Sequence, residues 1–121
     1  MRVETSIYED DIELVNPKTG ETERKIHFRL NIAQMYDKIA LKKEELSKIA
    51  PDKVEELGRA TIELFDLIFG EDAVSDILDY YRQDYIAMIG DLTPVVCDYL
   101  YPALDTYRAR LMEARKRVKR G

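Results

Sequence analysis

The hydrophobic periodicity of the chain changes once, at Asn31, and this change is the strongest constraint on its fold. Before Asn31 apolar residues alternate with polar ones, as in Ile26, Phe28 and Leu30, which is the pattern of a strand with one buried face. After Asn31 the apolar residues recur every three or four positions, as in an amphipathic helix. The sequence therefore predicts a mostly α fold: a small helical domain of about four helices with an N-terminal β-hairpin, α+β at the margin.

The expected hairpin occupies residues 1–30. Its turn is Asn16-Pro17-Lys18-Thr19-Gly20, where Pro17 presets a turn φ and Gly20 can adopt a positive φ at little steric cost. Residues 11–15 should pair with 22–30, whereas 2–8 could form a third strand or a mobile arm. Because an isolated hairpin is marginal in water, its apolar face should lie against the helices.

Helical periodicity fills residues 31–118, and three elements are expected before residue 83. The first runs from 31 to 49 with Asn31 as N-cap, and its segment Lys42–Leu46 should mostly face solvent. The second begins with a capping box, Asp52-x-x-Glu55, and ends at Gly70. Asp72 should then cap a third helix, 73–82. The second helix has the clearest core face: Val54, Leu57, Thr61, Leu64, Phe65 and Ile68.

The secondary structure of residues 83–92 is ambiguous from the sequence. Thr93-Pro94 then predicts the start of a new helix, with Thr93 as N-cap and Pro94 at the first helical position. This last helix should run towards residue 118. Pro102 should kink it, because proline cannot donate to the carbonyl of Asp98. Its expected inward stripe is Val96, Leu100, Ala103, Tyr107 and Leu111.

Charge is unevenly distributed along the 121 residues, a length typical of a single domain spanning 1–121. Residues 108–121 hold seven basic residues and one acidic residue, a net charge of +6, whereas residues 1–107 hold 12 basic and 23 acidic residues, a net charge of −11. The acidic body should repel nucleic acid, so only the basic tail at 115–121 and the helix before it could bind phosphate. Three interpretations of this end stay open: a solvated end that complements the helix dipole, which the pattern favours, docking on an acidic protein, and phosphate binding.

Sequence motifs for nucleotide, metal or redox chemistry are absent. The single histidine, His27, alternates to the outer face of a strand and should be an ordinary solvated side chain, while Cys97 should be a partly buried, inert thiol. We therefore expect a protein that is not an enzyme and needs no cofactor or metal. The acidic start and the absence of a long apolar run predict a soluble, cytoplasmic protein with no membrane partner.

The last third of the chain is rich in tyrosine, a residue that suits surfaces covered by a partner only part of the time. On the last helix Cys97, Tyr101 and Met112 should form an exposed apolar strip for a partner helix or a second copy of the chain. Basic residues accompany this strip. The candidate partner-binding residues are Cys97, Tyr101, Arg108, Met112, Arg115 and Arg117.

Two segments resemble the tail assembly chaperones of long-tailed phages and prophages. In that family a segment of the form F-x-x-[IV]-F-G-E precedes a helix, and here residues 65–71 read FDLIFGE. A late helix with two prolines and paired aliphatic residues then ends in basic residues, as 91–117 does with Pro94, Val95, Val96 and Pro102.

This resemblance implies a non-enzymatic protein of the host bacterial cytoplasm that binds the tape-measure protein, or another phage tail protein, and keeps it soluble during tail assembly. It also implies self-association, for which the 3–7 arm and the basic tail are the expected contacts. The alternative is a small nucleic-acid-associated or regulatory protein that binds phosphate through its basic C-terminal helix. The composition disfavours nucleic acid as a partner.

Overall fold

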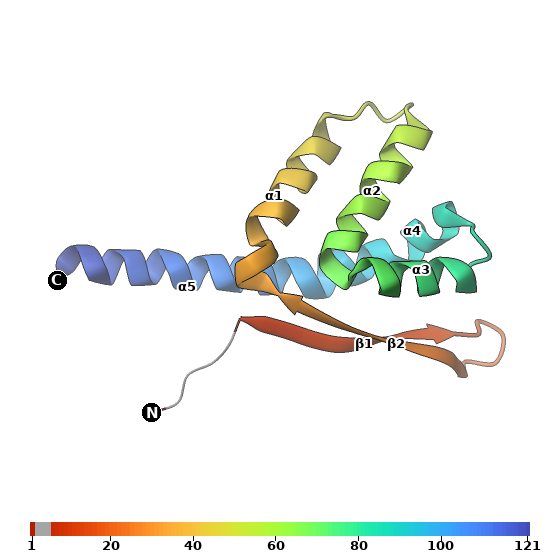
Figure 1. The fold of residues 1–121 in the computed structure, drawn as a ribbon, viewed down its shortest axis with the longest axis horizontal. Helices are drawn as coiled ribbons and strands as arrows, with labels where there is room; N and C mark the ends of the chain where they lie inside the picture. Colours follow the sequence, from red (N-terminus) through yellow and green to blue (C-terminus); the bar gives the residue numbers. More distant parts are fainter. Residues whose placement is uncertain (2–5) are drawn as a thin grey trace.

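The fold is mostly α with an N-terminal β-hairpin, as predicted (Figure 1). A computed structural model describes residues 1 and 6–121. The elements follow in the order β1 Ile7–Val15, β2 Thr22–Asn31, α1 Ile32–Lys48, α2 Val54–Phe69, α3 Glu71–Tyr80, α4 Tyr85–Val95, the π-helical turn η1 Val96–Leu100, and α5 Tyr101–Arg120. Helices α1 and α2 stand on one side of the hairpin, and α5 projects beyond it.

The hairpin is antiparallel, with Ile12 opposite Ile26, and its turn is the predicted one. Gly20 has a φ of 73°, and the Asn16 side chain accepts a hydrogen bond from the Lys18 N–H at 2.9 Å. Strand β1 begins at Ile7 rather than at residue 11, and the described residues contain no third strand. The remainder of the expected arm, residues 2–5, lies outside the described residues.

One face of the hairpin packs against the helices, because the alternation places its apolar side chains on a single side. The Phe28 ring meets the Phe69 ring edge-on at a centroid distance of 4.9 Å, and both α2 and α3 contact β2. All the buried apolar side chains belong to one cluster drawn from the hairpin and every helix. The residues of the hairpin face are Ile12, Leu14, Ile26, Phe28 and Leu30.

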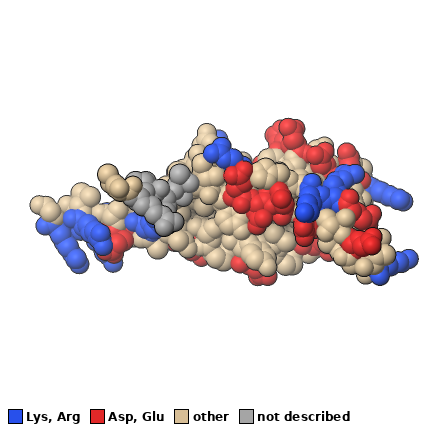
Figure 2. Space-filling view, turned by 90° about the horizontal axis from the view of Figure 1, so that it is seen from below, with Lys and Arg blue, Asp and Glu red and all other residues tan. Residues whose placement is uncertain are grey.

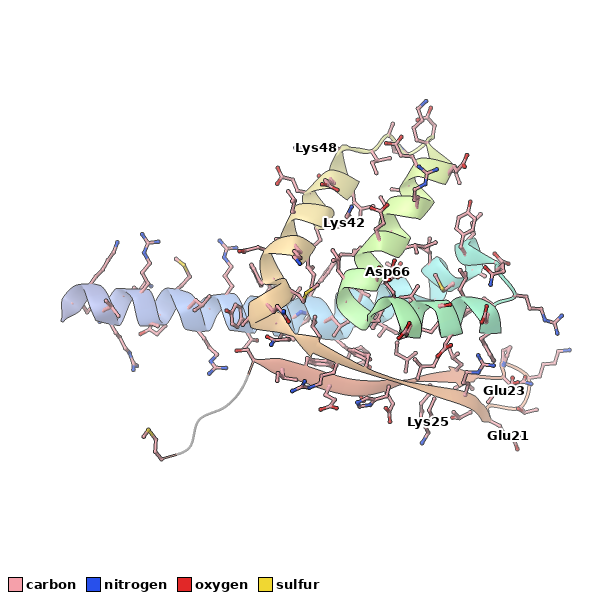
Figure 3. The ribbon with its side chains drawn as sticks, viewed as in Figure 1. Glu21, Glu23, Lys25, Lys42, Lys48 and Asp66 are labelled. Atoms are coloured by element: carbon pink, nitrogen blue, oxygen red, sulfur yellow. The ribbon has the colours of Figure 1, made fainter. Side chains whose placement is uncertain are left out.

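Helix α1 starts as predicted, since the Asn31 side chain accepts a hydrogen bond from the Gln34 N–H at 3.2 Å. Its second half is less exposed than the sequence suggests. Leu46 packs against the core, and Lys42 reaches across to α2, where its Nζ lies 2.6 Å from Glu63 Oε2 (Figure 3). Lys42 tolerates this position because its aliphatic stem lies between the two helices while its ammonium group pairs with the Glu63 carboxylate.

The predicted capping box at α2 is wrong. The Lys53 N–H bonds to the carbonyl of Ala50 at 3.0 Å, so Asp52 lies in a turn before the helix. Lys53 becomes the N-cap, without a side-chain hydrogen bond. Val54 consequently lies at the exposed start of the helix, whereas Leu64, Phe65 and Ile68 of the same predicted face are buried.

Gly70 ends α2 as predicted, with a φ of 92° and its N–H bonded to the carbonyl of Asp66 at 3.0 Å. It also precedes α3 directly, because its own carbonyl accepts the Val74 N–H at 3.1 Å. Asp72 is therefore in the first turn of α3 and is not its N-cap, contrary to the prediction.

The predicted helix start at Thr93-Pro94 is wrong as well. Helix α4 begins at Tyr85, where the Asp84 side chain accepts a hydrogen bond from the Ala87 N–H at 3.1 Å. Thr93 lies inside this helix, and its hydroxyl donates to the carbonyl of Ile89 at 2.6 Å. The hydroxyl therefore bonds backwards within a helix instead of capping the next one.

The last helix continues α4 through the π-turn η1, in which the Tyr101 N–H bonds to the carbonyl of Val96. This wider turn comes immediately before Pro102, so the interruption expected at that proline takes the form of a π-turn. Beyond it Leu104 is buried, but Leu111, predicted to face inward, is 54% exposed. The prediction fails at Leu111 because α5 has by then extended past the body (Figure 1).

Candidate functional site: an apolar groove and a basic arm

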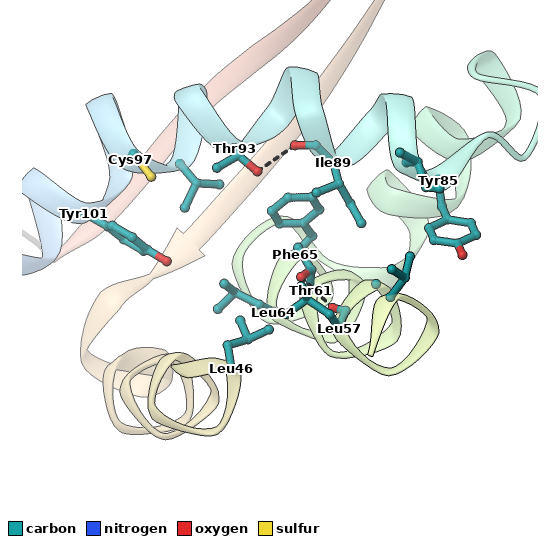
Figure 4. Close-up of a pocket in the computed structure, with 14 residues that line it drawn as sticks. Leu46, Leu57, Thr61, Leu64, Phe65, Tyr85, Ile89, Thr93, Cys97 and Tyr101 are labelled. Atoms are coloured by element: carbon teal, nitrogen blue, oxygen red, sulfur yellow. Dashed lines mark hydrogen bonds between the residues drawn. The ribbon is translucent and has the colours of Figure 1, made fainter. Parts of the chain in front are cut away.

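An apolar groove of about 360 Å³ lies between α2 and the helix formed by α4 and η1 (Figure 4). We call it the groove. Its polar lining groups are few, and the hydroxyls of Thr61 and Thr93 are already bonded to carbonyls of their own helices, at 2.8 and 2.6 Å. The lining residues are Leu46, Val54, Leu57, Gly58, Thr61, Leu64, Phe65, Tyr85, Ile86, Ile89, Thr93, Val96, Cys97 and Tyr101.

One end of the groove is shaped by a close approach of α2 and α4. Gly58 is buried beneath the Tyr85 ring, and a Cβ at residue 58 would lie 2.7 Å from Tyr85 Cε2. The absence of a side chain on Gly58 therefore allows the ring to rest on α2. At the rim the apolar side chains of Val54 and Ile86 are 57% and 61% exposed, so the groove opens to solvent through apolar atoms.

Two of the predicted partner-binding residues, Cys97 and Tyr101, lie at the other end of the groove. Cys97 is exposed, and the prediction of a partly buried thiol is wrong. Tyr101 was expected on an exposed strip but is partly buried, with Lys43 Nζ 3.9 Å from its ring centroid. Burial raises the pKa of the Tyr101 hydroxyl. Both residues therefore face a hollow rather than an open helix surface.

The other four predicted residues, Arg108, Met112, Arg115 and Arg117, lie on the projecting part of α5. We call residues 108–120 the arm. Every one of them is exposed, and in Figure 2 the projecting end shows mainly basic side chains, whereas acidic and basic side chains are mixed over the body. Since a helix rises 1.5 Å per residue, Met112 lies about 16 Å along the axis from Tyr101. The structure does not bring the six residues together; it divides them between the groove and the arm.

The sequence missed most of the α4 side of the groove, because residues 83–92 were ambiguous. Tyr85, Ile86 and Ile89 all line it. Two signals could have found this helix: Asp84 as an N-cap, and the spacing of Ile86, Ile89 and Thr93, which places them on one helix face.

A cluster of polar groups, separate from the groove and the arm, lies on the solvent face of the hairpin. His27 is exposed as predicted, but it is not isolated: its Nδ1 lies 2.8 Å from Asp11 Oδ1, and its Nε2 lies 2.7 Å from Glu9 Oε1. Because ionised carboxylates only accept hydrogen bonds, both ring nitrogens donate and the imidazole is charged in this arrangement. The hydrogen bonds with Asp11 and then Glu9 raise the pKa of His27.

The single histidine makes this cluster measurable. A raised folded pKa means that the cluster stabilises the fold below the unfolded value of about 6.5, and that this stabilisation disappears as the pH rises through the folded pKa. We expect the lone histidine signal in an NMR titration to have a pKa above 6.5. In the Asp11→Asn variant that pKa should move back towards 6.5. A wild-type value at or below 6.5 would contradict the geometry.

The described residues offer no other obvious chemical centre. Across residues 1 and 6–121 no three side chains of histidine, cysteine, aspartate or glutamate are arranged to hold a metal ion. None of the described helices combines the length and the apolar character that crossing a membrane requires.

Comparison with known proteins does not assign the chain to a family. No family model, curated protein or solved structure matches the chain. The resemblance to tail assembly chaperones stays a prediction from the two sequence segments.

Proposed function

We propose that the protein is a non-enzymatic chaperone that covers an apolar helical segment of a partner. The observation that carries the proposal is the groove, an apolar hollow open to solvent between α2 and α4. An amphipathic helix presents apolar side chains at positions i, i+3, i+4 and i+7, and such side chains fit an apolar groove between two helices. Its volume is at the lower end of ligand pockets, so it suits a few side chains of a helix that lies across it.

The resemblance of residues 65–71 and 91–117 to tail assembly chaperones suggests the partner. A tape-measure protein is a long helix, and a long helix with an uncovered apolar stripe aggregates unless another surface shields the stripe. A small acidic protein with an apolar groove supports solubility in two ways. It removes apolar surface from water, and it adds net negative charge to the complex.

Coexpression with a long helical protein encoded next to this chain, the expected tape-measure protein, tests the proposal. The chain should raise the soluble fraction of that protein several-fold, and the Ile86→Asp variant should lose most of this effect because it places a charge on the apolar rim of the groove. Leu41→Asp is the matched control, since Leu41 is 58% exposed on α1 and does not line the groove. Equal rescue by the wild type and by Ile86→Asp at equal expression would refute the proposed site.

The only cysteine of the chain permits a direct measurement. Because Cys97 is exposed and lines the groove, a photo-crosslinker attached to it should couple to the coexpressed tape-measure protein. As a control, the crosslinker can be moved to residue 41 in a Cys97→Ser, Leu41→Cys variant. Crosslinking of equal strength from both positions would show that contact is not localised at the groove.

A further inference from the structure

Helix α5 carries an apolar stripe that the rest of the molecule covers only at its beginning, before the arm. Five residues of α5 recur at the a and d positions of a heptad: Leu104, Tyr107, Leu111, Ala114 and Val118. The first two contact the body, since Leu104 is buried and the Tyr107 ring lies 5.7 Å from the ring of Tyr36 on α1. The rest of this stripe, which we call the seam, is exposed: 54% for Leu111 and 79% for Val118.

Arginine occupies every position that flanks the seam. With Leu104 at position a, the e positions of the arm are Arg108 and Arg115, and the g positions are Arg110 and Arg117. Side chains at e and g lie beside the partner helix in a coiled coil and select it by charge. The one acidic residue of the arm, Glu113, is at an outer position and pairs with Arg117 at 3.5 Å.

We propose that the arm binds lengthwise to a partner helix whose own apolar seam is flanked by acidic residues. Burying Leu111, Ala114 and Val118 supplies the apolar contact, and aspartate or glutamate on the partner meets the four arginines. Two arms from two copies of this chain would instead place arginine against arginine along both edges of the seam. The charge pattern therefore disfavours pairing between two arms and favours a helix with acidic flanks.

Phosphate binding accounts for these features less completely. A nucleic acid backbone would engage the basic side chains, but it would leave Leu111 and Val118 in water. All four positions at the seam edges are arginine, whereas the outer positions 116 and 119 are lysine and position 120 is arginine, and arginine at the edges suits the planar arginine–carboxylate pairing of helix interfaces. This inference goes beyond the proposed function, because it concerns a second surface and does not require the groove.

Two designed peptides test the inference with the full chain. Each has three heptads with leucine at a and d, and they differ only at e and g, which are all glutamate in one and all lysine in the other. Like charges keep each peptide from pairing with itself. We expect fluorescence anisotropy to show that the glutamate peptide binds at least about tenfold more tightly than the lysine peptide.

Matched variants locate the contact. Arg110→Glu with Arg117→Glu should abolish the preference for the glutamate peptide, whereas Lys116→Glu with Lys119→Glu makes the same change in net charge at outer positions and should preserve it. Leu111→Asp with Val118→Asp should remove binding of both peptides. Circular dichroism and urea unfolding should show an unchanged body in each variant, and Ile86→Asp should bind the peptides normally.

Four results would overturn the inference. The first is equal affinity for the two peptides, and the second is an equal loss of affinity for the glutamate peptide in the arginine and lysine double variants. The third is binding that survives the Leu111→Asp, Val118→Asp substitutions. The fourth is displacement of the glutamate peptide by duplex DNA at equal concentration. Analytical ultracentrifugation gives a further test. If the wild-type chain is a dimer and Leu111→Asp makes it a monomer, the seam binds a second copy instead. Because Ile86→Asp leaves the arm intact, a failure of the proposed function at the groove can be told apart from a failure of peptide binding at the arm.

Discussion

Replacing Phe65 by alanine is expected to lower the free energy of unfolding by about 3–5 kcal/mol. Phe65 is 1% exposed on the inner face of α2, and its ring lies 6.0 Å from that of Phe69, which in turn contacts Phe28 of the hairpin. Truncation removes contacts at the point where α2 joins the other elements. A domain of this size has a total stability of about 5–15 kcal/mol, so the variant loses a large share of it.

Urea unfolding followed by circular dichroism measures this loss. Val54→Ala is the matched control on the same helix, because Val54 is 57% exposed and its truncation should change stability by less than about 0.5 kcal/mol. If Phe65→Ala cost no more than Val54→Ala, the assignment of the inner face of α2 to the core would be wrong.

Alanine substitutions at the two glycines inside helices are expected to have opposite effects. Gly90 in α4 has open space around it, so Gly90→Ala should stabilise the protein by about 0.5–1 kcal/mol through helix propensity. Gly58 lies beneath Tyr85, and the new methyl group would come within 2.7 Å of the ring. Overpacking typically costs about 1–3 kcal/mol, so Gly58→Ala should destabilise the protein despite the same gain in propensity.

A double-mutant cycle isolates the cause of the second effect. In a Tyr85→Ala background the ring is gone, and Gly58→Ala should then stabilise the protein as Gly90→Ala does. A stabilising Gly58→Ala in the wild-type background would mean that the ring leaves α2 without cost, and that the closed end of the groove is not built as described.

Strand periodicity and two local capping signals were sufficient to predict the hairpin, the start of α1 and the end of α2. The alternation from Ile12 to Leu30 was read correctly because each side chain of a strand faces either the core or water, and the helices cover one face only. Asn31 and Gly70 act where predicted, since a side-chain acceptor and a positive φ are both local properties.

The last third could not be predicted in the same way, because local signals there favour a break that the packing overrides. Thr93-Pro94 is a good helix start, yet it is nine residues into α4. Inward residues recur at a spacing of four from Met88 to Leu104, and each such step in a straight α-helix drifts by about 40°. The π-turn at 96–100 compensates for this drift. A regular helix projected from the sequence therefore misses Leu104, whereas Leu111 shares the face of Leu104 and is exposed because the body does not reach it.

The candidate site was only half predictable, for a related reason. The sequence predicts Cys97 and Tyr101 on one exposed strip of the last helix, whereas in the structure they line a groove that depends on α2, α4 and Gly58 meeting in three dimensions. The spacing of residues along one helix predicts which side chains share a face. It does not predict whether a second helix packs opposite that face to form a groove.

Because α4, η1 and α5 follow one another directly from Tyr85 to Arg120, the groove wall and the arm belong to one helical rod about 54 Å long. The π-turn is its irregular joint, and Cys97 sits in that joint with Tyr101 at its end. A partner helix bound lengthwise along α5 would therefore share its axis with one wall of the hollow.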